Sequence, residues 1–341
     1  AWTGVAWVKA TGIAGLNNGF KYRKQGDSEW IDLSGDAITN DGGDFSAAID
    51  NLQPLTSYEC YAYSGDNQTE PQSFTTEEAR QMPNSSFEIF SNDESSKYYS
   101  FYDPLSTILE NQTKWWCSGN KGSTTVGSSY SIPVPDGNDK VDGNYSVKLQ
   151  SQYVIVKFAA GNIFVGEFAG VLGTKGGKVN FGRPWTSRPT ALKLYCKYTT
   201  GTMDIINSTP PGVVLTKADY DRAQIKIALG TWDYKKYGGT PQSPVHINTT
   251  DASTFVDFAT DPSTIADGNL IIHHDGYLMN GADKVSAQTG EWTEYVIPLN
   301  YHSMDTLPTH IIVSCASSQF GDYFTGCSSS KLWIDAVELV Y

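Results

Sequence analysis

The chain has 341 residues, of which 13% are aromatic, 18% are charged and 32 are glycine. This length favours two domains, and this composition favours broad β faces and tight turns over charged helix surfaces. The formal net charge of −13 argues against binding to a phosphate backbone, so we expect no nucleic-acid partner. No apolar run approaches the roughly 20 residues that span a bilayer, and no signal-like segment opens the chain, so we expect a mature, trimmed chain without a transmembrane segment.

Residues 1–76 contain short alternating runs separated by glycine turns, at the spacing of a β-sandwich. The motif Leu52-Gln-Pro-Leu-Thr-Ser-Tyr58 resembles the tyrosine corner of fibronectin type III domains, in which the phenol hydroxyl bonds to upstream backbone. We therefore predict an immunoglobulin-like or fibronectin III-like module over residues 1–78. No cysteine before Cys117 can pair with Cys60, so we expect Cys60 to be a buried single thiol.

The five cysteines have no metal-ligand spacing and are odd in number, which favours buried free thiols throughout. A polar stretch at 76–83 then separates the predicted module from a longer series of strand-like runs. No helix-period segment longer than about two turns interrupts them. The clearest runs lie at 146–160, 191–198, 223–230, 269–274, 293–299 and 309–317. We therefore predict an all-β chain in which a larger β-sandwich jelly roll over residues 79–341 follows the first module.

The two ends of the second domain carry a matched pair of motifs. Asn84-Ser-Ser-Phe87-Glu88 opens it, and Asp335-Ala-Val-Glu338-Leu lies in its last strand-like run. The pairing resembles carbohydrate-binding jelly rolls of the galactose-binding type, whose early glutamate and late aspartate often hold a structural calcium. The resemblance implies calcium at Glu88 and Asp335, and we expect no other cofactor. The alternative is that Asp335 only accepts backbone hydrogen bonds.

A central segment at 160–198 combines Glu167 with two Arg-Pro steps, Arg183-Pro184 and Arg188-Pro189, on either side of Trp185. Each proline holds the preceding residue extended and removes a backbone donor, which suits a rim or a crossover; a stiff connecting loop is the alternative. The run Gly161-Asn162, Gly166, Gly182-Arg183-Pro184, Arg188-Pro189 and Tyr195-Cys-Lys-Tyr198 resembles the putative carbohydrate metabolism domain of secreted Bacteroidetes proteins. This resemblance implies carbohydrate use in an extracellular, periplasmic or outer-membrane surface lipoprotein.

Catalysis of glycoside hydrolysis needs two carboxyl groups at a fixed separation. The E-x-D-x-E pattern that would align them on one strand is missing from the second domain. Asp335 and Glu338 are three positions apart, so an unbulged strand would send them to opposite faces. Glu167 is the best single candidate for a catalytic carboxylate, and the sequence identifies no partner for it.

Saccharide binding needs flat aromatic rings together with planar polar groups, and the central segment has both. Adjacent tryptophans point apart, and we favour Trp116 over Trp115 as the one that contacts ligand. We therefore predict one pocket for an oligo- or polysaccharide, formed by Trp116, Asn162, Glu167, Arg183, Trp185 and Arg188. A glycoside hydrolase and an adhesion or structural surface component remain the alternatives.

Overall fold

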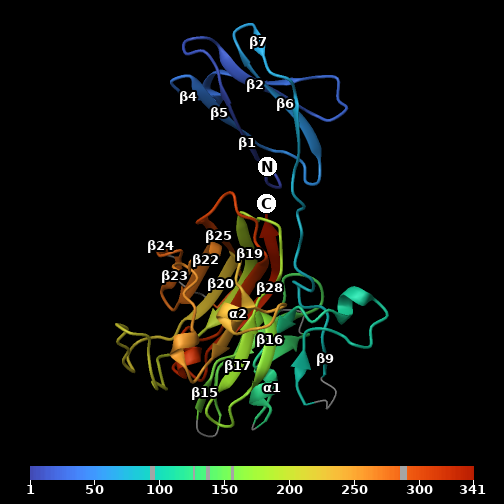
Figure 1. The fold of residues 1–341 in the computed structure, drawn as a ribbon. Helices are drawn as coiled ribbons and strands as arrows, with labels where there is room; N and C mark the ends of the chain where they lie inside the picture. Colours follow the sequence, from blue (N-terminus) through green and yellow to red (C-terminus); the bar gives the residue numbers. More distant parts are fainter. Residues whose placement is uncertain (93–96, 126, 136–138, 155–156, 285–289) are drawn as a thin grey trace. The chain divides into compact units, whose positions relative to one another are not determined.

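The structure is a computed structural model, and it describes residues 1–92, 97–125, 127–135, 139–154, 157–284 and 290–341. The described chain forms two compact units (Figure 1). Unit 1 comprises Ala1–Arg80, Ser187–Pro189 and Tyr341, and unit 2 comprises Gln81–Thr186 and Thr190–Val340. Almost all regular structure is antiparallel β-strand, which confirms the all-β prediction.

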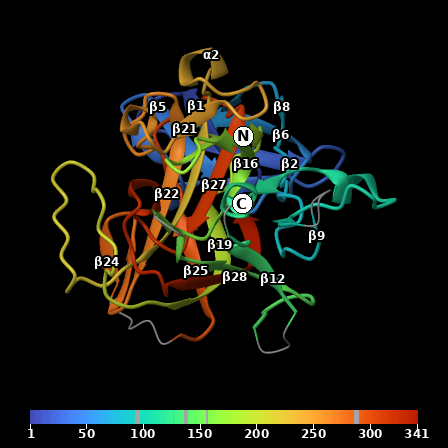
Figure 2. The same ribbon diagram turned by 90° about the horizontal axis from the view of Figure 1, so that it is seen from below.

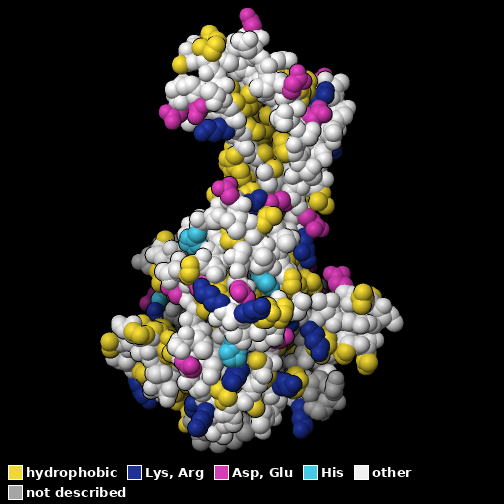
Figure 3. All heavy atoms as spheres, viewed as in Figure 1, with side chains coloured by type: hydrophobic (Ala, Val, Ile, Leu, Met, Phe, Trp, Pro, Cys, Tyr) yellow, Lys and Arg dark blue, Asp and Glu magenta, His cyan; other side chains and the backbone are white. Residues whose placement is uncertain are grey.

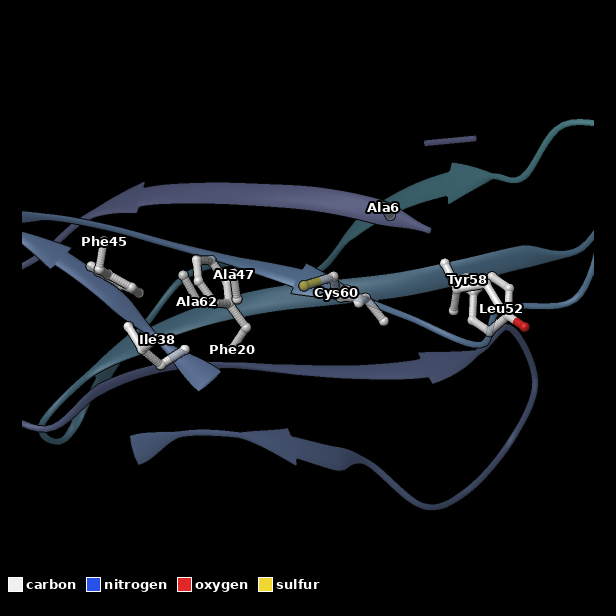
Figure 4. Close-up of a cluster of buried hydrophobic side chains, with 10 residues drawn as sticks. Ala6, Phe20, Ile38, Phe45, Ala47, Leu52, Tyr58, Cys60 and Ala62 are labelled. Carbon is white, nitrogen blue, oxygen red and sulfur yellow. The ribbon is translucent and has the colours of Figure 1, made fainter. Parts of the chain in front are cut away.

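Unit 1 contains two sheets. The smaller has the order β1 (Ala6–Thr11), β5 (Asp44–Ile49), β4 (Thr39–Asp41). The larger has the order β3 (Ile31–Leu33), β2 (Asn18–Lys24), β6 (Ser57–Ser64), β7 (Asn67–Gln68), and β8 (Gln72–Thr75) also pairs with β6. Alternate side chains of β6 are buried, so Tyr58, Cys60 and Ala62 enter a core that includes Phe20 and Phe45 (Figure 4). Burial along this strand therefore alternates with the period of two residues that the sequence predicts.

The motif that ends at Tyr58 makes the hydrogen bond that it predicts. The backbone N–H of Gln53 donates to the Tyr58 hydroxyl at 2.9 Å. The Tyr58 ring stacks on Phe74 with ring centroids 5.6 Å apart. Cys60 is a buried free thiol, as predicted, and burial raises its pKa to about 11. The other four cysteines are also free, and only Cys117 is not fully buried.

The larger sheet of unit 2 has eleven strands. Its main path is β21 (Val245–Asn248), β17 (Gly177–Phe181), β16 (Asn162–Val171), β27 (His310–Ala316), β20 (Ala223–Gly230), β22 (Thr264–His273), β23 (Gly276–Met279) and β24 (Ala282–Lys284). Three short strands pair alongside it: β11 (Trp116–Cys117) with β16, β18 (Arg183–Pro184) with β27, and β26 (Asn300–Tyr301) with β22. Figure 2 shows β16 and β27 side by side, and β20 separates β27 from β22 in the strand order.

The smaller sheet of unit 2 has the order β12 (Ser131–Val134), β13 (Ser146–Gln150), β28 (Lys331–Val340), β19 (Ala191–Thr199), β25 (Thr293–Pro298). It packs face to face on the larger sheet. A Cβ added at Gly268 in β22 would lie 3.0 Å from a methyl of Ile297 in β25, and the Tyr277 and Tyr295 rings are 5.1 Å apart. Strands β22 and β23 of the larger sheet and β25 of the smaller sheet therefore contribute to one apolar interior. This confirms the predicted larger β-sandwich.

The remaining elements are short. They are β9 (Ser91–Asn92), β10 (Tyr99–Ser100), β14 (Gln152–Val154), β15 (Lys157–Ala159), α1 (Asn120–Ser123), α2 (Tyr234–Tyr237), η1 (Gly35–Ala37), η2 (Leu109–Gln112), η3 (Ala252–Thr254) and η4 (Gly321–Tyr323). Within the described ranges, no helix has the length and apolarity needed to cross a membrane.

A buried carboxylate joins several strand ends of unit 2. Asp221 is fully buried, and its Oδ2 accepts hydrogen bonds from the Cys327 N–H at 2.8 Å, the Ser330 hydroxyl at 2.8 Å and the Ser318 hydroxyl. Its Oδ1 accepts from the Arg222 N–H at 2.8 Å. Burial nevertheless raises the pKa of Asp221 to about 6, because these neutral donors do not fully replace the lost water.

Candidate functional site

A pocket of about 280 Å³ lies in unit 2, at the place where β11, β16 and β18 meet. We call it the Glu167 pocket. Its charged lining residues are Lys114, Lys121, Glu167 and Arg183. Its aromatic lining residues are Tyr98, Tyr99, Phe101, Tyr102, Trp116 and Phe168, and Ser100, Cys117, Ser118, Asn120 and Gly166 complete it. Three predicted site residues, Trp116, Glu167 and Arg183, therefore line one cavity.

A wider groove of about 380 Å³ lies in unit 1 and is lined mostly by polar side chains. Lys21, Asp32 and Tyr63 are among them, and no residue that we predicted for a saccharide site contributes to it. The Glu167 pocket is smaller, yet it collects the predicted residues and more aromatic rings. We therefore take the Glu167 pocket as the candidate site.

The Glu167 carboxylate is held in place from two sides. Glu167 on β16 lies directly opposite Asn180 on β17, and Asn180 Nδ2 donates to its Oε1 at 3.0 Å. The Thr240 hydroxyl donates to the same oxygen, also at 3.0 Å. No hydrogen bond to Oε2 is found among the described residues, so this oxygen keeps its acceptor capacity.

Asn180 connects Glu167 to a histidine on the next strand. His246 on β21 lies opposite Asn180, and its Nδ1 is 2.7 Å from Asn180 Oδ1. Because the carboxylate can only accept, the amide must turn its NH2 to Glu167 and its oxygen to His246, so Nδ1 of His246 carries the proton. Burial and the nearby Lys178 lower the pKa of His246, which favours the neutral ring. The three side chains form a fixed row across three strands.

Arg183 is anchored mainly by backbone oxygens. Its Nε donates to the Lys114 carbonyl at 3.0 Å and its Nη2 to the Gly166 carbonyl at 2.6 Å. Its Nη1 donates to the Ser243 hydroxyl and, at 3.4 Å, to the Gly182 carbonyl. Burial lowers the pKa of Arg183 and the Glu167 carboxylate opposes this, so the guanidinium keeps its charge.

A glycine permits this arrangement of strands. Gly166 has φ 153°, and a Cβ there would lie 2.2 Å from the carbonyl oxygen of Asn180. Any larger residue would push β16 away from β17 and displace Glu167 and the oxygen that Arg183 binds. This explains the glycine in the middle of an otherwise strand-like run.

Cys117 also lines the pocket, beside Glu167 and Arg183. Burial raises the pKa of its thiol, so the thiol is protonated at neutral pH. A protonated thiol is a weak nucleophile, so Cys117 contributes to the lining as a small, partly buried apolar group.

The predicted tryptophan and asparagine have structural roles. Trp116 is only 2% exposed; its Nε1 donates to the Pro83 carbonyl at 2.9 Å and its ring packs on Phe87. It forms a wall of the pocket and leaves little ring surface for a sugar. Asn162 does not line the pocket: its Oδ1 accepts from the Gly119 N–H at 2.9 Å, which positions the start of α1.

Trp185 and Arg188 lie elsewhere, which corrects the expectation that all six residues share one pocket. Trp185 is 1% exposed and packs against Trp115, with ring centroids 6.0 Å apart. Arg188 belongs to unit 1, where its Nε donates to the Glu77 carboxylate at 3.1 Å and its guanidinium lies 4.7 Å from the Trp2 ring. A nearly buried arginine needs such a counter-ion, so Arg188 is committed to Glu77.

Sequence reasoning missed several lining residues that come from other segments. The strongest overlooked signal is the run Tyr98-Tyr-Ser-Phe-Tyr102, which places an aromatic cluster on and around β10. Lys114 was not predicted either. In the structure its Nζ lies 4.9 Å from the centre of the Tyr102 ring. Lys121, in α1, carries no local motif that distinguishes it from any exposed lysine.

The two carboxylates predicted to bind calcium already accept hydrogen bonds from backbone N–H groups. Asp335 Oδ2 accepts from Val141 at 2.6 Å and from Asp142 at 2.9 Å, and its Oδ1 accepts from Ala336 at 2.7 Å. Glu88 Oε1 accepts from the N–H groups of Asn144 and Tyr145, both at 2.8 Å. A cation at these sites would compete with the backbone donors for the same carboxylate oxygens, which weighs against calcium. Within the described residues, no group of three or more His, Cys, Asp or Glu could hold a metal. Calcium here stays a prediction, and the hydrogen bonds favour the alternative for Asp335.

A β-bulge changes the geometry expected for Asp335 and Glu338. Tyr195 lies opposite Asp335 and Lys193 lies opposite Glu338, so two steps along β19 match three steps along β28. Ala336 takes up the extra residue with φ 48°. The bulge puts the two carboxylates on one face, contrary to the expectation for an unbulged strand. Asp335 is fully buried beneath backbone donors, however, and Glu338 pairs with Lys193, so they form no open catalytic cleft.

Comparison with known proteins agrees with this architecture. The structure of a putative glycoside hydrolase from Bacteroides thetaiotaomicron VPI-5482 superposes with a TM-score of 0.53 at 20% identity, covering 92% of this chain and 85% of that chain. One from Bacteroides vulgatus ATCC 8482 gives a TM-score of 0.49 at 19% identity, covering 75% of this chain and 96% of that chain. No curated protein matches. The first likeness shows a shared fold. The family model of the putative carbohydrate metabolism domain matches residues 86–340, so the chain belongs to that carbohydrate-related family.

Proposed function

We propose that this protein binds a saccharide in the Glu167 pocket. The observation that carries the proposal is the combination of half-buried aromatic rings with polar groups that the fold already holds in place. Phe168 and the tyrosines offer apolar surface to the C–H face of a sugar ring, while Glu167 and Arg183 are fixed before any ligand arrives. Groups that are fixed in advance lose little entropy on binding.

Glycoside hydrolysis is the second candidate, because the structural neighbour from Bacteroides thetaiotaomicron is described as a putative glycoside hydrolase. Glu167 would then supply one carboxyl group. Among the described residues, no second Asp or Glu lines the pocket, whereas both hydrolytic mechanisms require two carboxyl groups. The pocket therefore supports binding better than hydrolysis. An adhesion role, the third candidate, has no comparable feature in its favour.

A glycan array probed with the full chain tests the proposal, followed by calorimetric titration of each hit. Phe168→Ala should weaken binding about 10-fold, because it removes apolar contact surface from the pocket. Tyr220→Ala removes an aromatic ring that does not line the pocket and serves as the matched control. Equal affinities for the two variants would contradict the proposed site.

The same hits, incubated with the protein and assayed for new reducing ends, separate the two candidates. In a hydrolase, Glu167→Gln would abolish turnover and leave binding largely intact. We expect no turnover by the unsubstituted chain. We also propose that the protein works outside the cytoplasm, in the periplasm or at the cell surface, which fractionation of the source cells would test.

A further inference from the structure

The charge of the Glu167 pocket is opposite to that of the whole chain. The sequence contains 37 acidic and 24 basic residues. The described lining of the pocket contains three basic residues, Lys114, Lys121 and Arg183, and a single carboxylate, Glu167. Figure 3 shows both acidic and basic side chains on the visible face of unit 2. A concave site concentrates a local excess of charge of one sign.

The carboxylate does not neutralise the lysines. Glu167 lies close to Arg183 and partly offsets the charge of that guanidinium, and Glu167 Oε1 already accepts hydrogen bonds from Asn180 and Thr240. Lys114 and Lys121 make no ion pair with any carboxylate of the described chain. Two ammonium groups at the pocket are therefore left without a counter-ion from the protein.

One of these lysines is held at the pocket by an aromatic ring. Lys114 Nζ lies 4.9 Å from the centre of the Tyr102 ring, and both residues line the cavity. The carbonyl of Lys114 also accepts a hydrogen bond from Arg183 Nε at 3.0 Å, which fixes the backbone at this lysine. A cation restrained in this way loses less rotamer entropy when an anion binds to it.

We propose that the Glu167 pocket selects a saccharide that bears an anionic group, either a uronic acid carboxylate or a sulfate ester. This inference rests on the function proposed above and adds the ligand's charge to it. The aromatic lining would contact the sugar ring, and Lys114 and Lys121 would pair with its anionic group. A neutral saccharide would fill the same space without forming an ion pair with either ammonium group.

The test uses the full chain and compares probes that share one sugar backbone and differ in charge. Trigalacturonic acid and its methyl ester share one backbone and differ in the carboxylate charge and the ester methyl groups, and sulfated neocarratetraose differs from its desulfated form in the sulfate ester. Titration calorimetry at low salt should show an anionic probe binding about 10-fold more tightly than its neutral counterpart. The advantage should shrink at high salt because screening weakens these pairs.

Substitutions at the lysines then test whether these residues cause the preference for the anionic probe. The double variant Lys114→Gln/Lys121→Gln should lose most of the difference in affinity between the anionic probe and its neutral counterpart. Lys217 does not line the pocket, so the control variant Lys217→Gln should keep this difference. Preference for the carboxylate pair or for the sulfate pair would each support the inference and identify the anionic group. Equal affinities for charged and neutral probes, or a preference that survives the double substitution, would overturn it. If neither anionic probe binds while the array identifies a neutral ligand for this pocket, the inference fails and the proposed saccharide binding stands.

Discussion

Glu167 and Asn180 are direct cross-strand partners on β16 and β17, and Asn180 Nδ2 donates to Glu167 Oε1 at 3.0 Å. The pair fixes the only carboxylate that lines the pocket within the described chain. Asn180→Asp would replace this donor with a second carboxylate at the same distance. We expect the free energy of unfolding to fall by about 1–3 kcal/mol at pH 7, because like charges this close repel and a hydrogen bond is lost.

At about pH 4 one carboxyl of the pair should carry a proton and restore the hydrogen bond, so the loss should shrink. Urea unfolding at both pH values measures this. Asn180→Ala, which removes the donor and adds no charge, is the control and should show no such recovery. A loss that is the same at both pH values for Asn180→Asp would argue against the contact.

Arg183 holds β18 to the Lys114 and Gly166 carbonyls, so its shape matters as well as its charge. Arg183→Lys keeps the charge and loses the planar fork that reaches several acceptors. We expect unit 2 to lose about 1–3 kcal/mol of stability, since the part-buried Gly166 carbonyl is left without its guanidinium donor. Denaturant unfolding measures the loss, and Arg23→Lys in unit 1 is the control. An unchanged midpoint for unit 2 would show that the carbonyls find other donors.

The Tyr58 hydroxyl accepts one hydrogen bond from the Gln53 N–H, so Tyr58→Phe isolates that bond. Unit 1 should lose about 1 kcal/mol and melt at a lower temperature, while saccharide binding stays the same. Calorimetry of the full chain can follow the two units separately if they melt independently. Tyr61→Phe, on the same strand but outside the core, should leave the melting temperature unchanged. A Tyr58→Phe curve that superposes on the original would remove the tyrosine corner.

Asp221 should make unit 2 more stable in mild acid. The folded pKa is raised to about 6 and the unfolded value is about 3.9, so the folded state binds more protons between these values. Its contribution is therefore fully present below about pH 4 and is lost as the pH rises through about 6, by about 3 kcal/mol. Asp221→Asn cannot ionise and should lack this slope. Stability curves of the two proteins that run parallel from pH 4 to pH 7 would contradict the shift.

Asp335 is expected to act through hydrogen bonds alone. Its oxygens accept from three backbone N–H groups, so EDTA and added calcium should leave the melting temperature of unit 2 unchanged. Asp335→Asn should destabilise unit 2 by about 1–3 kcal/mol, because an NH2 group then faces a buried donor. A melting temperature that falls with EDTA and recovers with calcium would restore the calcium prediction.

Several features of the candidate site could be predicted from the sequence because they depend on local chemistry. Glu167 follows a glycine inside β16, Arg183 stands between a glycine and a proline at a strand end, and these two residues do line one pocket. Arg188 has the same local pattern as Arg183, yet its partner is Glu77, which is far from it in the sequence. The Arg-Pro step specifies an extended backbone and says nothing about which carboxylate or carbonyl the guanidinium will meet.

The sequence by itself determined the two-sandwich architecture, because a period of two along each strand decides which side chains are buried. It also determined the Tyr58 hydrogen bond, whose partners are only five positions apart. Only the tertiary structure decided that Tyr102, Lys114 and Lys121 join Glu167, and that a bulge at Ala336 turns Asp335 and Glu338 to one face. The pairing of strands that are distant in the sequence determines where these residues lie, and a local sequence pattern does not specify that pairing.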